Sequence, residues 1–130
     1  QDRLVRLVET KDLGLRVSFH GHVSEEKKNE VISSSGCLVS LSEFESFGIT
    51  LLESAMIGTP IIASKIPPFL EISEKIGGRI TLVDPDNPDE IIEALEATLG
   101  AKDLVKFESL EEFTWERHAD RLEEHYMKII

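Results

Sequence analysis

Two glutamates and a glycine stand at a spacing that could hold a sugar and a phosphate together. Seven residues separate Glu45 from Glu53, and Gly48 lies between them, directly after Phe47. A carboxylate offers acceptor oxygens that match neighbouring hydroxyl groups, so each glutamate could bind a diol. Gly48 lets a ligand approach the backbone closely, and the first free N–H groups of a helix starting at Ile49 would form an anion site. One ligand satisfies all three features, a nucleotide diphosphate sugar.

The segment 45–64 is predicted to present these groups as a loop, a helix, a tight turn and a strand. The helix over 49–57 is expected to bury Leu52, Ala55 and Met56, and a Gly-Thr-Pro turn then leads into a short apolar run. The same pattern also fits an ordinary helix-turn-strand unit with two solvated glutamates.

The whole stretch resembles the donor-binding signature of retaining glycosyltransferases of the GT-B fold, the glycosyltransferase group 1 or family 4. This family includes mannosyl, glucosyl and sucrose-phosphate synthase enzymes. Its motif runs Glu-x-Phe-Gly-x-x-x-x-Glu-Ala-Met-Ala-x-Gly-x-Pro-Val-Ile-Ala. Here Ser54, Ile57 and Ile61 replace two alanines and a valine, which are mild departures.

The resemblance implies a role for each part of the signature. Glu45 would contact hydroxyls of the transferred sugar and is the candidate catalytic residue, whereas Glu53 would hold the ribose diol. The distal phosphate would meet the main chain of the loop and of the helix start, which comprises Ser46, Phe47, Gly48 and Ile49. The nucleotide diphosphate sugar would be a co-substrate, and no cofactor is expected.

A second candidate contact lies in the loop His20-Gly21-His22. This loop follows an expected strand over 16–20, and open α/β sheets bind ligands at the carboxyl ends of their strands. In the resembling family, a similar Phe-x-Gly-x-Val-Ser stretch lies beside the nucleotide base, so Gly21 with His22 or Val23 is expected near the base. A solvated loop histidine is the alternative. His20 and His22 have no evident third ligand, so no metal site is predicted.

Apolar runs and helical patterns alternate along the chain, which predicts a parallel sheet covered by helices on both faces. The fold class is therefore α/β and Rossmann-like, and by resemblance it is part of the C-terminal half of a GT-B fold. The expected strands are 16–20, 37–41, 60–63 and 79–83.

The pattern also predicts three details of the helices. Pro67-Pro68 should keep the chain out of a helix until Phe69. Two apolar stripes at helical spacing are expected to be buried. They are Ile91, Ile92, Leu95 and Leu99 in one helix, and Trp115, Ala119, Leu122, Tyr126 and Ile129 in the last one.

Composition limits the partners. The 130 residues are enough for one domain, and 41% are hydrophobic but only 6% aromatic. A net charge of −11, from 25 acidic and 14 basic residues, opposes binding of nucleic acid or anionic lipid through the bulk surface. No apolar run approaches the roughly 20 residues of a membrane span. With no signal peptide and the single cysteine Cys37, a cytoplasmic location is expected.

The resemblance covers nearly all of the chain but only about the last third of a two-domain enzyme. Residues 1–130 are thus interpreted as one partial donor-binding domain, without the N-terminal acceptor domain and without the first two strands of the C-terminal half. The arginine and lysine that neutralise the diphosphate in the family would also be absent. The strand over 16–20 would then pair directly with the strand over 37–41, or a second copy would complete the sheet as a homodimer.

The sequence therefore predicts the donor-binding portion of a retaining, metal-independent glycosyltransferase that moves a sugar from a nucleotide diphosphate to a hydroxyl acceptor. The fragment alone is expected to be inactive, and peripheral membrane contact of the parent protein stays open. Two alternatives remain. One is a sugar-nucleotide epimerase of the same two-domain fold, which the spacing of the two glutamates disfavours, and the other is a non-catalytic regulatory or scaffold module.

Overall fold

The computed structural model describes residues 2–77, 80–101, 107 and 110–128. Within them, three parallel strands form one sheet in the order β1-β2-β3, and they comprise β1 (Leu38–Ser40), β2 (Ile61–Ser64) and β3 (Ile80–Val83). The helices are α1 (Asp2–Thr10), α2 (Glu25–Ser34), α3 (Ile49–Ile57), α4 (Pro67–Ile76), α5 (Pro88–Gly100), the short 3-10 helix η1 (Leu110–Phe113) and α6 (Trp115–Met127).

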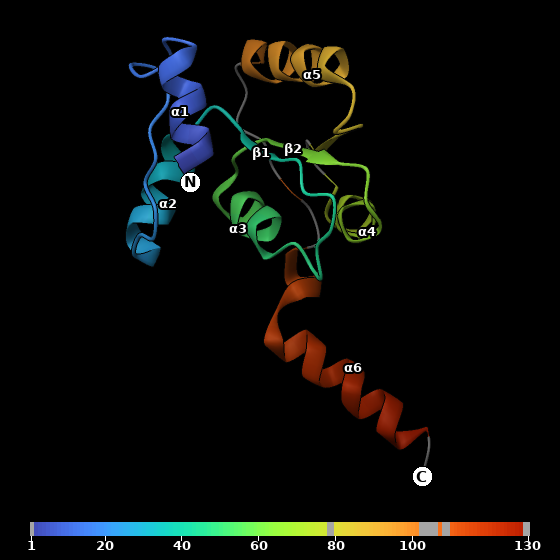
Figure 1. Ribbon diagram of the computed structural model, residues 1–130. Helices are drawn as coiled ribbons and strands as arrows, with labels where there is room; N and C mark the ends of the chain where they lie inside the picture. The colour runs from blue at the N-terminus through green and yellow to red at the C-terminus, as the bar shows by residue number, and fades with distance from the viewer. Residues whose placement is uncertain (1, 78–79, 102–106, 108–109, 129–130) are drawn as a thin grey trace.

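Helices cover both faces of this sheet, as predicted. Helix α5 lies along one face, and α3 and α4 lie along the other (Figure 1). The central strand β2 is fully buried and serves both layers, because successive side chains of a strand point to opposite faces. Ile61 and Ala63 belong to the core with α3 and α4, whereas Ile62 packs in the cluster with Ala94 of α5. The α/β parallel architecture is therefore confirmed.

Helix α3 has the predicted bounds, but its buried side is only partly as expected. Leu52 and Ala55 are buried, together with Leu51 and Ser54, whereas Met56 is 74% exposed. The sheet and α2 both pack against α3. Cover from two sides brings Leu51 and Ser54 into the core and leaves Met56 in solvent.

Helix α4 begins earlier than the sequence suggested. It starts at Pro67, after Ile66 in an extended conformation, and not at Phe69. Proline is compatible with the first turn because the N–H that it lacks would have no partner there within the helix. The early start places Phe69 in the core, where it is fully buried.

The apolar stripe of α5 is also rotated from its predicted position. Ala94 and Thr98 are buried, whereas Ile92 and Leu99 are more than half exposed. Small side chains face the sheet here, so the helix packs closely and the larger residues lie at the edges of the contact. Of the predicted stripe, Ile91 and Leu95 pack against the core cluster.

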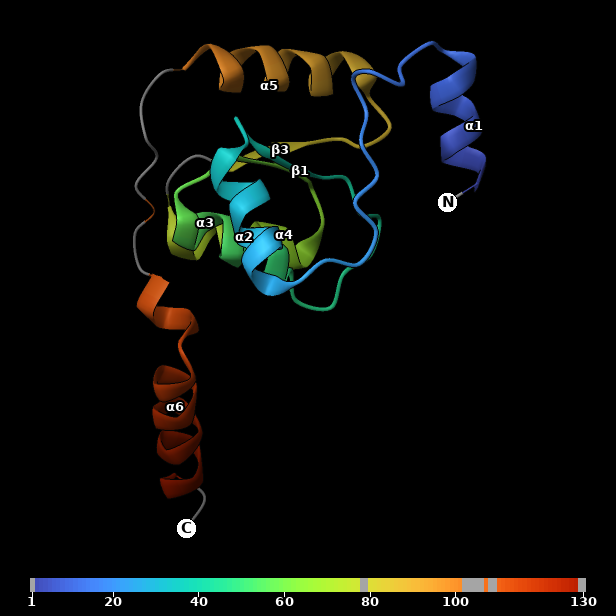
Figure 2. The ribbon, with the colours of Figure 1, turned by 90° about the vertical axis from the view of Figure 1, so that its left-hand side faces the viewer.

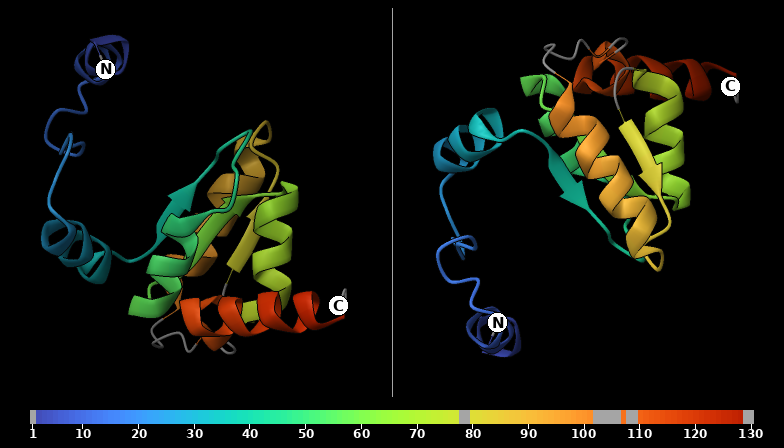
Figure 3. Two further views of the ribbon diagram at one scale, coloured as in Figure 1. Left: turned by 90° about the horizontal axis from the view of Figure 1, so that it is seen from below. Right: turned by 90° about the horizontal axis from the view of Figure 1, so that it is seen from above.

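The predicted strand over 16–20 is wrong. These residues form an exposed, irregular segment that joins α1 to α2 at a distance from the sheet (Figure 3). A strand needs a hydrogen-bonded neighbour, and β1 pairs only with β2 in the described part of the chain. Direct pairing with the strand at Leu38, one of the two expected arrangements, therefore does not occur.

The last helix forms as predicted, but its apolar stripe is not buried. Trp115 is 84% exposed, Leu122 47% and Tyr126 64%. Helix α6 extends away from the sheet, as Figures 1 and 2 show, so its apolar face meets solvent. Ile129, predicted for the same stripe, lies outside the described residues.

Candidate functional site

The start of α3 requires a glycine. Gly48 is the N-cap residue and has φ 90° and ψ 41°, in the left-handed region that disfavours residues with a Cβ. It is also buried, and a Cβ at this position would lie 2.8 Å from Cε1 of Phe69 and 3.1 Å from Cδ1 of Ile72. The close approach of α4 thus fixes the residue type at the point where the signature loop enters the helix.

The N-terminus of α3 is open to an anion. No side chain of the described residues caps it, and its first turn contains no acidic residue. The carbonyl of Gly48 already accepts from the N–H of Leu51 at 3.0 Å, so the helical hydrogen bonding begins at once. The first N–H groups of a helix point out along its axis and carry a partial positive charge, so this end can bind a phosphate oxygen.

Glu45 lies in the loop between β1 and α3, and two serines anchor it. The hydroxyl of Ser42 donates to Oε1 of Glu45 at 3.1 Å, and the hydroxyl of Ser64 donates to the carbonyl of Ser42 at 2.5 Å. Ser64 is the fully buried last residue of β2. The central strand therefore holds the loop that presents Glu45. Sequence reasoning singled out neither serine, because their partners lie in a loop with no regular pattern.

Glu53 lies one turn further into α3 and forms an ion pair with α2. Its Oε1 is 2.7 Å from the ammonium of Lys28, which also lies 2.7 Å from Oε2 of Glu25. The carboxylates of Glu25 and then Glu53 raise the pKa of Lys28 above its ordinary value. Lys28 was also absent from the predicted site, since it is far from Glu53 in sequence.

Ser46, Phe47 and Ile49 are exposed around the same helix start. The ring of Phe47 makes an edge-to-face contact with Phe113, with centroids 6.2 Å apart and planes at 67°. Aromatic pairs favour this geometry, so the segment before α6 supports the signature loop.

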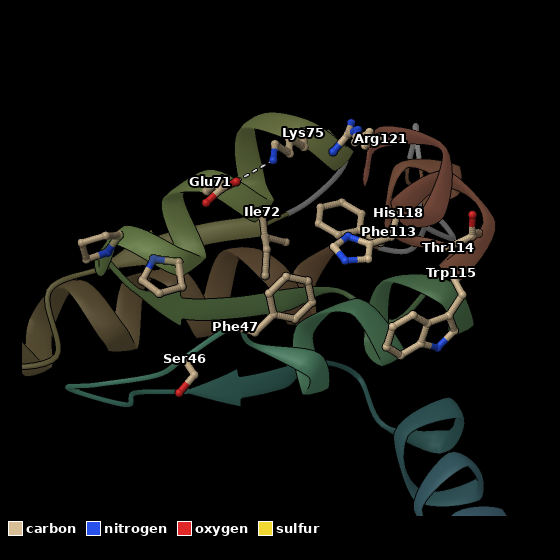
Figure 4. A pocket seen from close by; sticks show the side chains of 12 residues that line it. Ser46, Phe47, Glu71, Ile72, Lys75, Phe113, Thr114, Trp115, His118 and Arg121 are labelled. Atoms are coloured by element: carbon tan, nitrogen blue, oxygen red, sulfur yellow. Dashed lines mark hydrogen bonds and ion pairs between the residues drawn. The ribbon is translucent and has the colours of Figure 1, made fainter. Parts of the chain in front are cut away.

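A groove of about 590 Å³ lies beside this contact, between α4 and α6 (Figure 4). Ser46 and Phe47 line one side of it, and the Glu71–Lys75 ion pair of 2.5 Å lines another. Neither Glu45 nor Glu53 lines the groove. The groove is therefore not lined by the two glutamates for which the sequence predicts sugar and ribose contacts.

The structure does not bring Gly21 and His22 into the site. Both are exposed in the irregular segment before α2, and no hydrogen bond or ion pair of the described residues joins them to the signature. The base contact was predicted from a strand end, and the strand over 16–20 is absent. Only through α2, which begins three residues after His22, is this segment linked to Glu53.

Comparison with known proteins gives the family. Residues 1–109 match the family model described as glycosyl transferases group 1. The chain belongs to this family. The resemblance drawn from the signature is thereby confirmed, and the match extends well beyond the signature to most of the described chain.

Several known proteins are similar to the chain. A probable sucrose-phosphate synthase 2 of Oryza sativa subsp. japonica is 30% identical over 125 residues, which cover 88% of this chain and 13% of the plant protein. The D-inositol 3-phosphate glycosyltransferase of Rhodococcus opacus is 29% identical over an alignment of 131 residues, and the match covers 96% of this chain and 29% of that protein.

A solved structure supports the fold. The sucrose-phosphate synthase of Thermosynechococcus elongatus superposes with a TM-score of 0.76 at 27% identity, over 98% of this chain and 34% of that one. The Rossmann-like fold of a GT-B glycosyltransferase is therefore confirmed. The chain spans about a third or less of the length of these relatives.

Metal ligands do not cluster in the described part of the chain. No group of three or more His, Cys, Asp or Glu side chains there could hold a metal ion. None of the helices in the same residues is long and apolar enough to cross a membrane.

Proposed function

We propose that this chain is the donor-binding part of a retaining, metal-independent glycosyltransferase that works in the cytoplasm. It binds a nucleotide diphosphate sugar, and the complete protein transfers the sugar to a hydroxyl acceptor held by a second domain. The observation that carries the proposal is the N-terminus of α3, open to an anion and flanked by two glutamates, in a chain of the glycosyl transferases group 1 family.

The chemistry requires stabilisation of the leaving nucleoside diphosphate. As the bond between the sugar and the phosphate breaks, negative charge develops on the phosphate oxygen. The N–H groups at the start of α3 are fixed dipoles that meet this charge without reorganising, which is the most effective form of electrostatic catalysis. Gly48 forms the left-handed turn from which these N–H groups project, a conformation that disfavours residues with a Cβ.

The two glutamates bind the two neutral ends of the donor. Glu45 accepts hydrogen bonds from hydroxyls of the transferred sugar, and Glu53 accepts them from the ribose diol. A carboxylate with two oxygens suits a diol in both places. Retention of the anomeric configuration is part of the proposal because the signature resembles that of retaining enzymes.

Substitution of each glutamate in the complete protein tests this division of roles. Glu53→Gln should weaken nucleotide binding by roughly 1 to 3 kcal/mol, the scale of a hydrogen bond to a charged group. Glu45→Gln should leave the affinity for the free nucleotide nearly unchanged and lower turnover, because its partner is the sugar. Glu43→Gln is the matched control, since Glu43 is an exposed carboxylate of the same loop.

Calorimetry with the free nucleotide and a turnover assay with the nucleotide sugar give the two measurements. The nucleotide itself is chosen beforehand by a thermal-shift screen, since a ligand that binds only the folded state raises the melting temperature. Equal losses of nucleotide affinity in both variants would refute the division of roles. A protein that binds no nucleoside diphosphate and transfers no sugar would refute the proposed function.

A further inference from the structure

Lys28 stands beside the carboxylate that is proposed to bind the ribose. Its ammonium lies 2.7 Å from Oε1 of Glu53, and the two side chains are 28% and 26% exposed. We propose that Lys28 is a positioning residue for the donor, which holds Glu53 in the orientation that its carboxylate needs to accept hydrogen bonds from the ribose. This inference rests on the proposed function, because it gives Glu53 the ribose as its ligand.

The pair differs from the other ion pairs on the same helices. Lys27 of α2 pairs with Glu30 one turn away, and its side chain is 46% exposed. Because both residues of this pair lie on α2, it does not connect α2 to another element. The pair between Lys28 and Glu53, in contrast, connects residues 25 positions apart and joins α2 to α3. It therefore fixes a side chain of the signature from outside the signature.

The geometry leaves the carboxylate able to bind a ligand. Lys28 contacts Oε1 of Glu53, and a carboxylate has about four acceptor positions on its two oxygens. The hydroxyls of a ribose can thus be bound while the ion pair persists. A glutamate side chain that is free in solution samples many rotamers, and ordering it costs free energy when the ligand binds. The ion pair has already selected one orientation before the ligand arrives.

Glu25 gives the ammonium a second fixed contact. Its Oε2 lies 2.7 Å from the Lys28 nitrogen, and both residues lie on α2. The ammonium has three donor protons, so it can bind both carboxylates at once. Because two carboxylates hold it, Lys28 has less freedom to swing away from Glu53 into solvent. The three side chains form one cluster that begins on α2 and ends at the donor site.

An alternative role must be separated from this one. Lys28 could simply connect α2 to α3, and its removal would then loosen the domain and weaken every ligand alike. If Lys28 is a positioning residue, its removal should cost only the part of the nucleotide affinity that comes from the ribose hydroxyls. The ratio of affinities for a nucleotide and its 2′-deoxy counterpart isolates that part.

The experiment measures this ratio in the complete protein. The probe is whichever of UDP, GDP and ADP binds most tightly, together with its 2′-deoxy form, and calorimetry gives both dissociation constants. The unaltered protein should prefer the ribonucleotide by about tenfold or more, since the lost hydrogen bond goes to a charged group. Lys28→Met should reduce this preference to within about threefold, with less change in the affinity for the deoxynucleotide. Lys28→Arg, which keeps the charge, should restore part of it.

Two further variants control the interpretation. Lys27→Met, one position away on the same helix, should keep the full preference because its partner is Glu30. In a Glu53→Gln background, Lys28→Met should have no further effect on the ratio, since residues that act through one group are not additive. Circular dichroism and the melting temperature show whether each variant is folded.

The outcomes distinguish the inference from the proposed function. If Lys28→Met weakens both nucleotides by the same factor, or if Lys28→Met and Lys27→Met behave alike, the positioning role is refuted. If Glu53→Gln keeps the preference for ribose, the assignment of the ribose to Glu53 fails first. If Lys28→Met does not fold, Lys28→Gln takes its place, because it also removes the charge that pairs with Glu53. A folded Lys28→Gln protein that has lost the preference supports the role, and one with an unchanged preference overturns it.

Discussion

Replacing Gly48 by alanine should destabilise the domain strongly, for two separate reasons. The residue has a φ of 90°, and a left-handed conformation costs a residue with a Cβ about 1 to 2 kcal/mol. The new Cβ would also lie 2.8 Å from Cε1 of Phe69 and 3.1 Å from Cδ1 of Ile72. Both neighbours are buried, so relief requires movement of the core, which costs about 1 to 3 kcal/mol more.

The expected loss is therefore about 2 to 5 kcal/mol in the free energy of unfolding, a large part of the roughly 5 to 15 kcal/mol typical of a whole domain. Two other glycines separate the contributions. Gly21 has a φ of 62° and nothing within 4 Å of the position that a Cβ would take, so Gly21→Ala has the conformational cost without the clash. Gly14 also has open space and no positive φ, so Gly14→Ala should be close to neutral.

Urea unfolding of the three variants, followed by circular dichroism, measures these differences. The loss for Gly48→Ala should exceed that for Gly21→Ala by at least about 1 kcal/mol, the lower end of the cost of overpacking. Equal losses would show that α4 does not approach the signature loop as described.

Three further results are expected. Ser64→Ala should cost about 1 to 3 kcal/mol in urea unfolding and lower turnover, because it leaves the carbonyl of Ser42 without its donor. The ammonium of Lys65, 2.5 Å from Oε1 of Glu90, lowers the pKa of that carboxyl. The ionised Glu90 therefore stabilises the folded domain fully above its unfolded pKa of about 4.3, and this stabilisation is lost as the pH falls through the lower pKa of the folded state. The difference in stability between the unaltered protein and Glu90→Gln should therefore be constant near pH 7 and shrink below about pH 4.3. The 130-residue chain alone should show no low-micromolar binding of nucleotide sugars in calorimetry, because an exposed helix N-terminus contributes about 0.3 to 1 kcal/mol and micromolar affinity needs about 8.

The sequence predicted best where the cause of the structure is local. Ser24 is the N-cap of α2, and its hydroxyl accepts from the N–H of Lys27 at 3.3 Å, within the same short stretch of sequence. The bounds of α3 were predicted from a glycine at each end, and Gly48 and Gly58 are both left-handed. A cap or a left-handed turn depends on a few neighbouring residues, so its signal is contained in the stretch that forms it.

The errors concern features that depend on distant partners. The segment 16–20 alternates apolar and polar residues as a strand would, but alternation does not supply the neighbour to which a strand must bond. Trp115 and Tyr126 fall at helical spacing, yet spacing does not say which surface, if any, covers them. In the first case the missing neighbour leaves the strand itself unformed, and in the second the helix forms but its apolar face stays uncovered.

The same distinction applies to the candidate site. Glu45, Gly48 and Glu53 were found because the signature is contiguous. Lys28 and Ser64, which hold the two glutamates through an ion pair and through the anchored loop, lie on other elements. Their partners are 22 to 25 residues away in sequence, and no motif joins them. The groups proposed to bind the donor can therefore be recognised in a single sequence, whereas the groups that orient them cannot.

The different partners of the two glutamates agree with their proposed positions along the donor. Two like charges about 4 Å apart repel by about 1 kcal/mol in water and by about 4 kcal/mol at an effective dielectric constant of about 20. A bare carboxylate near the diphosphate would therefore oppose binding, all the more in a chain with a net charge of −11. Glu53 shares Lys28 with Glu25, so the ammonium offsets part of its charge, which favours a place for Glu53 on the nucleotide side of the phosphates. Glu45 accepts a hydrogen bond from the neutral hydroxyl of Ser42, which suits it to the uncharged sugar.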